Sequence, residues 1–523
     1  MQDVRAHITT YGCQMNRLDA ELLAHALRRA RARVVDDSEA ANVLLFLTCS
    51  VRAHAEERLF SNVGALKARK RREPDLLVGI LGCTAQQFGE RIRRRAPLAD
   101  IVCGPGRLAE VPDLIRRARR GDRPALALDP PRTDGACSAR RVAAPAAPER
   151  EDSARRGSRP AAHEGADAFM ALDARLDDLE LARPLGGPSP RHACVTVMRG
   201  CDNFCAYCVV PHVRGPERSR RPSAVLDEVR RLVAEGARQI TFLGQAVNKY
   251  EAEEDGRRWD LADLLAAAAD TRGLGRLHFI TNHPAAMTDR LAAVYRDVSA
   301  VCPYLHMPAQ AGSDAVLARM NRGYTAAEYE ARVAMVREAR PDVAVASDFI
   351  VGFPGETAAD FEATCALVRR TRFAGGFVFK YSPRPGTAAA QRYPDDVPAT
   401  EKRRRHQVLL DLVQESAAAE NRAMVGRTVP VFIEGPSPNP HLDADSQEDN
   451  RSRCGRAGWS GPEEAPPGRA SRPGHTSGSV QLRGRTPGGR IVVFDGPADA
   501  AGEILEVRLT RAADVTLFGE RVG

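Results

Sequence analysis

The feature that constrains this chain most is the stretch Arg-Gly-Cys-Asp-Asn-Phe-Cys-Ala-Tyr-Cys at 199–208. It follows a β-like run at 192–198, so Cys201, Cys205 and Cys208 lie on one loop and can reach a common centre. Iron–sulfur clusters built for electron transfer usually have four cysteine ligands, whereas a reactive metal site keeps one position open for its substrate. The spacing therefore predicts a three-thiolate cluster with one exposed iron. A structural zinc site with a distant fourth ligand is the alternative.

Length and cysteine content narrow the class of protein. A chain of 523 residues is long enough for about three domains with sizeable cores. Its twelve cysteines would suggest disulfides in a small secreted protein, but this chain is large and begins without a basic, apolar leader. The sequence also lacks an apolar run of about 18 residues that could span a bilayer. We therefore expect a cytoplasmic protein with thiols available for metal and with no membrane partner.

A second set of cysteines lies in the N-terminal part. Residues 1–125 alternate short apolar runs with amphipathic ones, which predicts an open α/β domain with a parallel sheet. Strands are expected at 4–10, 42–48, 76–81 and 100–103, and helices at 16–31 and 51–69. Cys13, Cys49 and Cys83 each follow one of the first three strands, whose carboxyl ends share the edge where ligands bind. We expect them to converge there, although ordinary buried cysteines would also fit. Cys103 is a rival ligand with core packing as its expected role.

Two further segments complete the middle of the chain. Residues 126–190 are rich in Ala, Arg, Pro and acidic residues, which predicts a low-complexity linker, and Cys137 inside it is not expected to bind metal. Residues 191–415 alternate strands and helices again. The strands are expected at 192–198, 239–243, 276–280, 305–307, 344–351 and 376–381, and the helices at 222–234, 260–269, 289–297, 314–320, 326–340 and 358–370. Six such units predict a partial (β/α)6 barrel that works at the carboxyl ends of its strands.

The C-terminal part begins with a basic helix and continues as short strands. An apolar stripe at 408–413 should pack on the barrel, while the charges of 402–405 face solvent or RNA. Runs at 428–433, 479–485, 490–494 and 504–510 predict a small antiparallel β-barrel over 425–523. A polar insertion at about 437–477, which contains Cys454, interrupts it. The net charge of +8 is compatible with a nucleic-acid partner.

These features together resemble the radical S-adenosylmethionine methylthiotransferases over nearly the whole chain. The resemblance implies an N-terminal methylthiotransferase domain with an auxiliary [4Fe-4S] cluster held by Cys13, Cys49 and Cys83. It implies a radical-SAM core in which the [4Fe-4S] cluster of the loop at 201–208 binds S-adenosylmethionine at the open iron. It also implies that the C-terminal β-barrel is an RNA-binding TRAM domain. The aromatic Tyr207, just before the third cysteine of the loop, belongs to the same pattern.

Several segments resemble one branch of that family, the tRNA 2-methylthio-N6-dimethylallyladenosine synthases. These are Tyr-Gly-Cys-Gln-Met-Asn at 11–16 and the segments at 209–220, 243–248, 347–357 and 381–387. The implied reaction is methylthiolation of C2 of N6-isopentenyladenosine at position 37 of tRNA, with the base splayed from its stack. Three alternatives stay open: action on threonylcarbamoyladenosine in tRNA, action on a ribosomal-protein aspartate, or a non-catalytic iron–sulfur RNA-binding protein.

The remaining site predictions concern residues beyond the six cysteines. Contact with S-adenosylmethionine is expected for Tyr207, Gln245 and Ser347, and contact with cofactor or substrate for Asn248, Gln310, Ser313 and Asp348, each of which could equally cap a helix or satisfy a loop. Arg214, Arg218, Arg220 and Arg221 either bind RNA phosphates or form a solvated face. The implied partners are tRNA, a reducing electron donor and a sulfur source, with no DNA. No catalytic residue beyond the cluster ligands is assigned.

Overall fold

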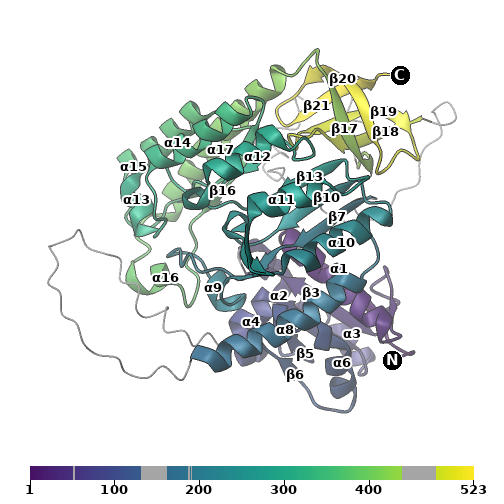
Figure 1. Ribbon diagram of the computed structural model, residues 1–523. Coiled ribbons are helices and arrows are strands. Elements are labelled where there is room, and N and C mark those ends of the chain that lie inside the picture. The colour runs from purple at the N-terminus through teal and green to yellow at the C-terminus, as the bar shows by residue number, and fades with distance from the viewer. Residues whose placement is uncertain (51–52, 131–161, 187–188, 190, 439–478) are drawn as a thin grey trace. The chain divides into compact units, whose positions relative to one another are not determined.

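A computed structural model describes residues 1–50, 53–130, 162–186, 189, 191–438 and 479–523 (Figure 1). The chain divides into two compact units. The first unit contains Met1–Arg183, Arg199–Arg218 and Arg384–Ala388, and the second contains Pro184–Met198, Ser219–Pro383 and Ala389–Gly523. The cysteine loop at 201–208 therefore belongs to the same unit as the N-terminal sheet, although it follows a strand of the other unit.

The first unit is built on a sheet of six parallel strands in the order β2-β1-β3-β4-β5-β6. Their bounds are β1 Arg5–Tyr11, β2 Arg33–Val34, β3 Val43–Thr48, β4 Leu77–Gly82, β5 Ile101–Cys103 and β6 Ala125–Ala127. The four predicted strands and the parallel arrangement are confirmed. Strands β3 and β4 are buried along their whole length, which explains their unbroken apolar sequence. The two edge strands β2 and β6 are too short to show a periodicity in the sequence.

Helices flank this sheet, and two apolar clusters form its core. The helical segments of the first unit are α1 Gln14–Arg29, α2 Ala53–Ala65, α3 Lys67–Arg72, α4 Cys83–Phe88, η1 Gly89–Arg91, α5 Ile92–Arg95, η2 Pro105–Glu110, α6 Val111–Arg119, α8 Ala162–Ala182 and α9 Val210–Val213. The single helix expected at 51–69 is in fact two helices, α2 and α3, because the helix is interrupted at Leu66. The interruption follows shortly after Gly64, and glycine weakens helices. Residues 51–52 lie outside the described residues.

The linker expected at 126–190 needs a correction. Residues 131–161, including Cys137, lie outside the described residues, but Ala162–Ala182 forms helix α8. Phe169, Leu172, Leu176 and Leu179 are buried on one side of it, at the spacing of a helical stripe. This stripe is hidden in a segment of Ala, Asp and Glu that resembles low-complexity sequence. Helix α8 packs on η2 and α1 of the N-terminal domain.

The second unit contains six parallel strands in two three-stranded sheets, β13-β10-β7 and β14-β15-β16. The strands are β7 His192–Thr196, β10 Gln239–Leu243, β13 Arg276–Phe279, β14 Tyr304–His306, β15 Ala344–Val351 and β16 Gly375–Lys380. A bridge between Leu277 and Val301 links the two sheets. The helices are α10 Pro222–Ala234, α11 Leu261–Ala269, α12 Asp289–Asp297, α13 Asp314–Arg319, α14 Ala326–Ala339 and α15 Ala358–Thr371. The partial (β/α)6 barrel is thus confirmed.

Several smaller elements of this part of the chain were not expected. The short strands β8 Met198–Arg199 and β9 Arg218–Ser219 lie where the chain passes between the units, and the segments η3 Val247–Lys249, η4 Pro284–Ala286 and α16 Ala388–Arg392 are single turns. Strands β11 Glu251–Glu254 and β12 Arg257–Asp260 form an antiparallel hairpin. Its Asp-Gly turn, with positive φ at Asp255 and Gly256, is a hairpin signal that the sequence did contain.

The basic helix expected after the barrel is α17 Ala399–Arg422. Leu409 and Val413 are buried as predicted and Leu412 is half-buried, and the helix packs on β16. Val408, which was expected in the same stripe, is exposed. The expectation that its charges all face solvent or RNA is wrong for two residues. Lys402 and Arg405 are buried because each pairs with a carboxylate, Lys402 with Asp395 and Arg405 with Glu356. Such pairing offsets the cost of burying the two cations.

The C-terminal strands form a closed barrel in the order β17-β18-β19-β21-β20, coloured yellow in Figure 1 except for β17. They are β17 Thr428–Pro436, β18 Ser479–Arg485, β19 Ile491–Pro497, β20 Ile504–Ala512 and β21 Thr516–Arg521. The barrel is antiparallel as expected, apart from the parallel pair of β19 with β21, and β21 was missed. Residues 439–478, including Cys454, lie outside the described residues. No helix in the described part of the chain is long and apolar enough to cross a membrane.

Candidate functional site

Three cysteines meet at the carboxyl edge of the N-terminal sheet. The register pairs Tyr11 with Thr48 and Thr48 with Gly82, so strands β1, β3 and β4 end at the same level. Cys49 and Cys83 come directly after their strands, and Cys13 follows β1 by two residues as the N-cap of α1. The predicted position of all three residues at one sheet edge is confirmed. We call Cys13, Cys49 and Cys83 the strand-end triplet.

Two glycines allow the strand ends to come this close. Gly12 has φ +150°, and a Cβ atom there would lie 2.6 Å from the Cβ of Cys49. Gly82 has φ +86°, and its Cβ would lie 3.1 Å from the carbonyl oxygen of Thr48. Both positions combine a backbone conformation that side chains rarely adopt with a close neighbour. The local sequence therefore keeps room for the sulfur atoms by leaving out side chains beside them.

Two thiols of the triplet, those of Cys13 and Cys83, have pKa values shifted in opposite directions. The pKa of Cys13 is lowered to about 6, mainly by its hydrogen bond with Cys49 and also by the positive charge of Arg214, against the effect of burial. The pKa of Cys83 is raised, because burial outweighs the attraction of Arg214. Metal ligands of this type bind as thiolates. The nearby cation therefore favours the form of both sulfurs that a metal centre needs.

The buried polar atoms around the triplet fit a sulfur-rich group. Asn16 Nδ2, Thr48 Oγ1, Ser50 Oγ and Thr84 Oγ1 are buried and have no hydrogen-bond partner among the residues that the structure describes. Each belongs to a residue that directly follows, precedes or lies one helical turn from a cysteine of the triplet. Buried polar groups are nearly always bonded, and hydrogen bonds to the sulfurs tune iron–sulfur clusters. These four groups are suitably placed to donate to cluster sulfur.

The thiols are not arranged around a single ion. Among the described residues, no three His, Cys, Asp or Glu side chains are grouped closely enough to hold one metal ion. The cysteines of a [4Fe-4S] cluster bind different iron atoms, so that their sulfurs stand farther apart than the ligands of one ion. Three cysteine thiols with one position left open are a ligand set that such a cluster can use.

The loop at 201–208 is held by its own backbone and by a neighbouring turn. The Cys201 N–H donates to the Gly215 carbonyl at 3.1 Å, and the Cys208 N–H donates to the Cys205 carbonyl at 2.9 Å. The Asn203 amide donates to the Cys201 sulfur at 3.3 Å. We call Cys201, Cys205 and Cys208 the loop triplet. Tyr207, the predicted cofactor contact, is half-buried beside them.

Gly200 is essential to the path of this loop. It has φ +77°, and a Cβ there would lie 1.8 Å from the carbonyl oxygen of Pro216. A contact this short is impossible for any side chain, so the residue before Cys201 must be glycine while the turn at 215–216 stays in place. The glycine of the sequence motif thus has a steric cause.

Arg214 lies in the segment that follows the loop triplet, and its side chain contacts the strand-end triplet. Its Nε atom donates to the Cys83 sulfur at 3.3 Å, and its terminal nitrogen donates to Asp19 at 2.6 Å. Val209, just before helix α9, and Val213, the last residue of α9, pack against Cys83 in one apolar cluster. The segment after the loop triplet therefore supplies both a cation and an apolar cover to a cysteine of the other triplet.

Asp19 is a site residue that the sequence analysis missed. It lies on the buried face of α1. Burial raises its pKa, and the Arg214 charge opposes this rise. A carboxylate within an apolar helical stripe requires a partner, and this was the signal in the sequence. Its partner could not be inferred, because Arg214 is far away along the chain.

The arginines predicted to bind RNA are mostly engaged within the protein. Besides Arg214, Arg218 pairs with Asp173 and Arg220 pairs with Glu228 at 2.7 Å. The prediction of phosphate contacts or a solvated face is therefore wrong for Arg214, Arg218 and Arg220. The sequence did not reveal their carboxylate partners, because these lie far along the chain or on a buried helix face. Arg221 is exposed just before α10, so a phosphate contact remains a prediction for it.

The polar residues expected at the barrel face have different surroundings. Gln245, just after β10, has a buried Oε1 atom to which none of the described residues donates a hydrogen bond. Ser347 is 0% exposed, and its hydroxyl accepts the Ala309 N–H at 2.9 Å. The Asn248 amide bonds both backbone groups of His283, at 2.9 and 2.7 Å. Gln245 thus has a free acceptor for a ligand, whereas Ser347 and Asn248 hold loops in place.

The remaining residues predicted at the barrel face are Ser313, Asp348 and Gln310. Ser313 caps α13 and bonds Asp360, and Asp348 lies 3.4 Å from His306, so both have structural partners. Gln310 is buried with a positive φ of 71° and bridges to Phe349. His283, which the sequence analysis did not single out, has a pKa lowered to about 3 by burial, so its ring is neutral.

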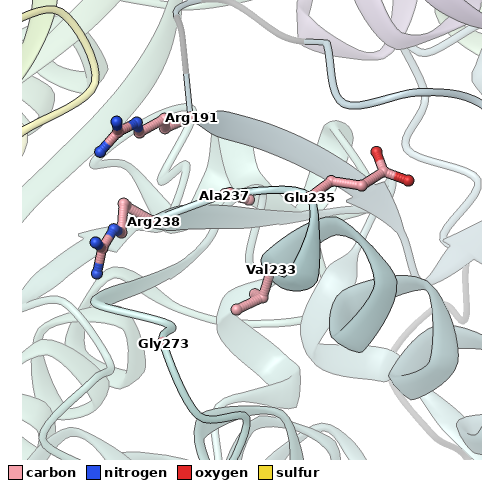
Figure 2. A pocket seen from close by; sticks show the side chains of 7 residues that line it. Arg191, Val233, Glu235, Ala237, Arg238 and Gly273 are labelled. Atoms are coloured by element: carbon pink, nitrogen blue, oxygen red, sulfur yellow. The ribbon is translucent and has the colours of Figure 1, made fainter.

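A pocket of about 450 Å³ lies elsewhere on the second unit (Figure 2). It is lined by Arg191, Val233, Glu235, Gly236, Ala237, Arg238 and Gly273. Arg191 and Gln239 mark the amino ends of β7 and β10, whereas barrels of this kind perform chemistry at the carboxyl ends of their strands. The pocket contains none of the predicted site residues, and we do not assign it to the reaction.

Three family profiles match successive parts of the chain. They are Uncharacterized protein family UPF0004 at residues 5–104, the Radical SAM superfamily at 195–368 and the TRAM domain at 477–522. Together with the fold and the cysteine sites, they define a radical S-adenosylmethionine protein with an added N-terminal domain and a TRAM barrel.

Curated relatives place the chain more narrowly. A tRNA-2-methylthio-N(6)-dimethylallyladenosine synthase from Rhodopirellula baltica is 38% identical over 98% of this chain and 94% of its own length. Proteins of the same name from Geobacter sulfurreducens and Syntrophotalea carbinolica are 37% and 36% identical, over 99% of this chain and 97% and 99% of their own lengths. The chain belongs to the tRNA-2-methylthio-N(6)-dimethylallyladenosine synthase family. A solved radical S-adenosylmethionine methyltransferase, TsrM from Kitasatospora setae, is a remote neighbour with 14% identity and a TM-score of 0.47, covering 74% of this chain and 75% of that one.

Proposed function

We propose that this enzyme methylthiolates C2 of N6-isopentenyladenosine at position 37 of tRNA, giving 2-methylthio-N6-isopentenyladenosine. The observation that carries the proposal is the presence of both cysteine triplets in one compact unit, with Arg214 bonded to Cys83. The full-length relatives named as synthases of this modification support the substrate, and the TRAM barrel supports tRNA as the partner. Neither alternative substrate is favoured by these relatives.

The two triplets are the proposed ligand sets for two [4Fe-4S] clusters. The strand-end triplet Cys13, Cys49 and Cys83 would hold the auxiliary cluster, and the loop triplet Cys201, Cys205 and Cys208 would hold the radical-SAM cluster. With three ligands each, both sets leave a position open. When bound, the clusters and S-adenosylmethionine would supply a carbon-centred radical for the unactivated C2–H bond and a methylated sulfur for transfer.

The residues around the triplets would orient the sulfur atoms and keep water away. Asn203 donates to the Cys201 sulfur and Arg214 donates to the Cys83 sulfur, so each set has at least one sulfur held by a side chain. Val209 and Val213 cover Cys83 with apolar surface. Such neighbours of metal ligands fix their orientation and set the polarity of the site.

Further residues are proposed to bind the cofactor and the substrate. We propose that Tyr207 and Gln245 contact S-adenosylmethionine, because Tyr207 adjoins the third ligand of the loop and Gln245 has an unbonded buried acceptor. Ser347 would act through the loop at Ala309, which it holds by a hydrogen bond. The reaction also requires a reducing electron donor and a sulfur source, since each turnover consumes an electron and a sulfur atom. Ligand thiols that stay reduced favour a cytoplasmic location.

Mass spectrometry of tRNA nucleosides from a deletion strain tests the proposal. We expect 2-methylthio-N6-isopentenyladenosine to disappear, N6-isopentenyladenosine to accumulate, and a plasmid copy of the gene to restore the modification. An unchanged level of the methylthiolated nucleoside would refute the proposed substrate. Loss of the methylthio group from threonylcarbamoyladenosine or from a ribosomal-protein aspartate would identify one of the other substrates. Zinc, or about four irons per chain in place of about eight, would refute the two-cluster assignment.

A further inference from the structure

In the sequence, helix α8 comes after the region that the UPF0004 profile matches, residues 5–104, and before the region that the radical-SAM profile matches, residues 195–368. Its buried apolar side chains pack on the N-terminal domain, and Leu176 belongs to the core of the sheet. Just after its C-terminal end, Arg183 pairs with Glu21 of α1 at 3.0 Å, and the Arg183 side chain is 1% exposed. The helix is therefore firmly attached to the domain that carries the strand-end triplet.

The side of α8 next to this apolar stripe presents carboxylates to the segment around the loop triplet. Arg199, two residues before Cys201, donates to Asp177 at 2.7 Å and to Glu180 at 2.8 Å. The Arg199 side chain is 9% exposed and that of Glu180 is 1% exposed. Charges this deep are stable only when paired, and removing one partner of a buried pair is strongly destabilising. The amino end of the cysteine loop is thus pinned to α8.

The carboxyl end of the same segment is pinned to the same helix. Arg218 donates to both oxygens of Asp173, at 2.5 and 3.2 Å, and its guanidinium lies 4.6 Å from the centre of the Phe169 ring. Asp173 also lies 3.6 Å from Arg199, so one carboxylate contacts the arginines at both ends. Phe169 fills the space above Gly215, where a Cβ would lie 2.7 Å from the ring.

We propose that α8 is a positioning helix that sets the place of the loop triplet relative to the strand-end triplet. Asp173, Asp177 and Glu180 act through Arg199 and Arg218, and none of the five is assigned to a cluster or to the substrate. Two reacting centres need fixed relative positions, because a misplacement of about 1 Å can cost on the order of a hundredfold in rate. The inference rests on the proposed function in assuming that the two triplets cooperate in one reaction.

Hydrogen exchange on the full-length chain without clusters tests the anchoring itself. In the double variant Asp177→Asn with Glu180→Gln, we expect faster exchange across 199–218 and unchanged exchange in β3 and β4. The matched control is Asp178→Asn, an exposed carboxylate of the same helix. Exchange at 199–218 equal to that of the control would overturn the proposal, whatever reaction the enzyme catalyses.

Reconstituted enzyme tests whether the anchoring serves coupling between the triplets. Asp173→Arg should raise the ratio of 5′-deoxyadenosine to methylthiolated tRNA by about tenfold, because the radical would form without reaching its target. Charge exchange, Asp173→Arg combined with Arg218→Asp, should bring the ratio part of the way back, since it rebuilds the pair between positions 173 and 218 but leaves Arg199 beside a second cation. A proportional loss of both products, with no rescue, would show that α8 is merely structural. Wild-type enzyme without tRNA activity would instead refute the proposed function and leave the exchange result valid.

Discussion

The two cysteine triplets are brought together by different means. The strand-end triplet gathers three residues far apart in sequence, and the strands β1, β3 and β4, of which β3 and β4 are fully buried, place them through their register. The loop triplet occupies one short segment without regular structure, and side-chain ion pairs and backbone hydrogen bonds place it. One site therefore depends on a hydrophobic core and the other on a few polar contacts. The difference predicts that the two sites respond differently to substitution.

The largest expected effect separates the two sites by their products. Cys201→Ala should abolish both cleavage of S-adenosylmethionine and methylthiolation, a loss of at least about a thousandfold. Cys13→Ala should abolish methylthiolation equally but keep the cleavage, and either variant should lower the iron content from about eight to about four per chain. Chromatography of 5′-deoxyadenosine and mass spectrometry of tRNA measure the two products. If Cys13→Ala also stopped cleavage, the division of roles between the triplets would be wrong.

Glycine substitutions test the backbone on which each site depends. Gly200→Ala places a Cβ 1.8 Å from the Pro216 carbonyl oxygen, so we expect a cost of about 3 kcal/mol and selective loss of the loop cluster. Gly12→Ala places a Cβ 2.6 Å from the Cys49 Cβ, so it should selectively lower the amount of cluster bound by the strand-end triplet. The control Gly121→Ala has a positive φ but open space around it, and should cost only about 1 kcal/mol. Iron analysis and thermal unfolding measure these effects. Equal iron loss in all three variants would contradict the steric explanation.

The same contrast explains how far the sequence alone could predict the molecule. Strand-end cysteines are visible because the apolar runs before them mark the strands, and parallel strands end at one edge. The barrel strands β10 and β15 and the helices α10 and α12 have the expected bounds for the same reason, a clear apolar period. Residues that pair only in the tertiary structure produce no such apolar period in the sequence. The pairing of Asp19 with Arg214 depends on two elements meeting in space, and the stripe of α8 is diluted by alanine and acidic residues.

Arg214 follows the loop triplet in the chain and bonds Cys83 of the strand-end triplet, so it belongs to the surroundings of both sites. Arg214→Gln leaves Asp19 buried without its cation, which should cost about 3 kcal/mol at neutral pH. Burial already raises the pKa of Asp19, and loss of Arg214 should raise it further. A carboxyl whose pKa is raised in the folded state stabilises that state at low pH, and the stabilisation is lost as the pH rises through the folded pKa. The destabilisation by Arg214→Gln should therefore be smaller at pH 5 than at pH 8.

Thermal unfolding of the cluster-free chain at both pH values measures this effect. The control is Arg230→Gln, which breaks an exposed pair with Asp227 and should change the Tm little at either pH. A pH-independent difference between Arg214→Gln and wild type would show that Asp19 is not the group left unpaired. It would also remove the electrostatic link between the loop segment and the strand-end triplet.

The smallest effects are expected at the barrel face, where ligand contact and loop support can be separated. Gln245→Ala should raise the KM for S-adenosylmethionine several-fold without changing the Tm, because its Oε1 atom has no hydrogen-bond partner in the described part of the chain. Ser347→Ala should lower the Tm instead, by the equivalent of about 1 kcal/mol, because it leaves the Ala309 N–H unbonded in a buried place. Steady-state kinetics and unfolding of the same two variants make the test. A Tm loss in Gln245→Ala with an unchanged KM would assign that side chain to loop support, as for Ser347.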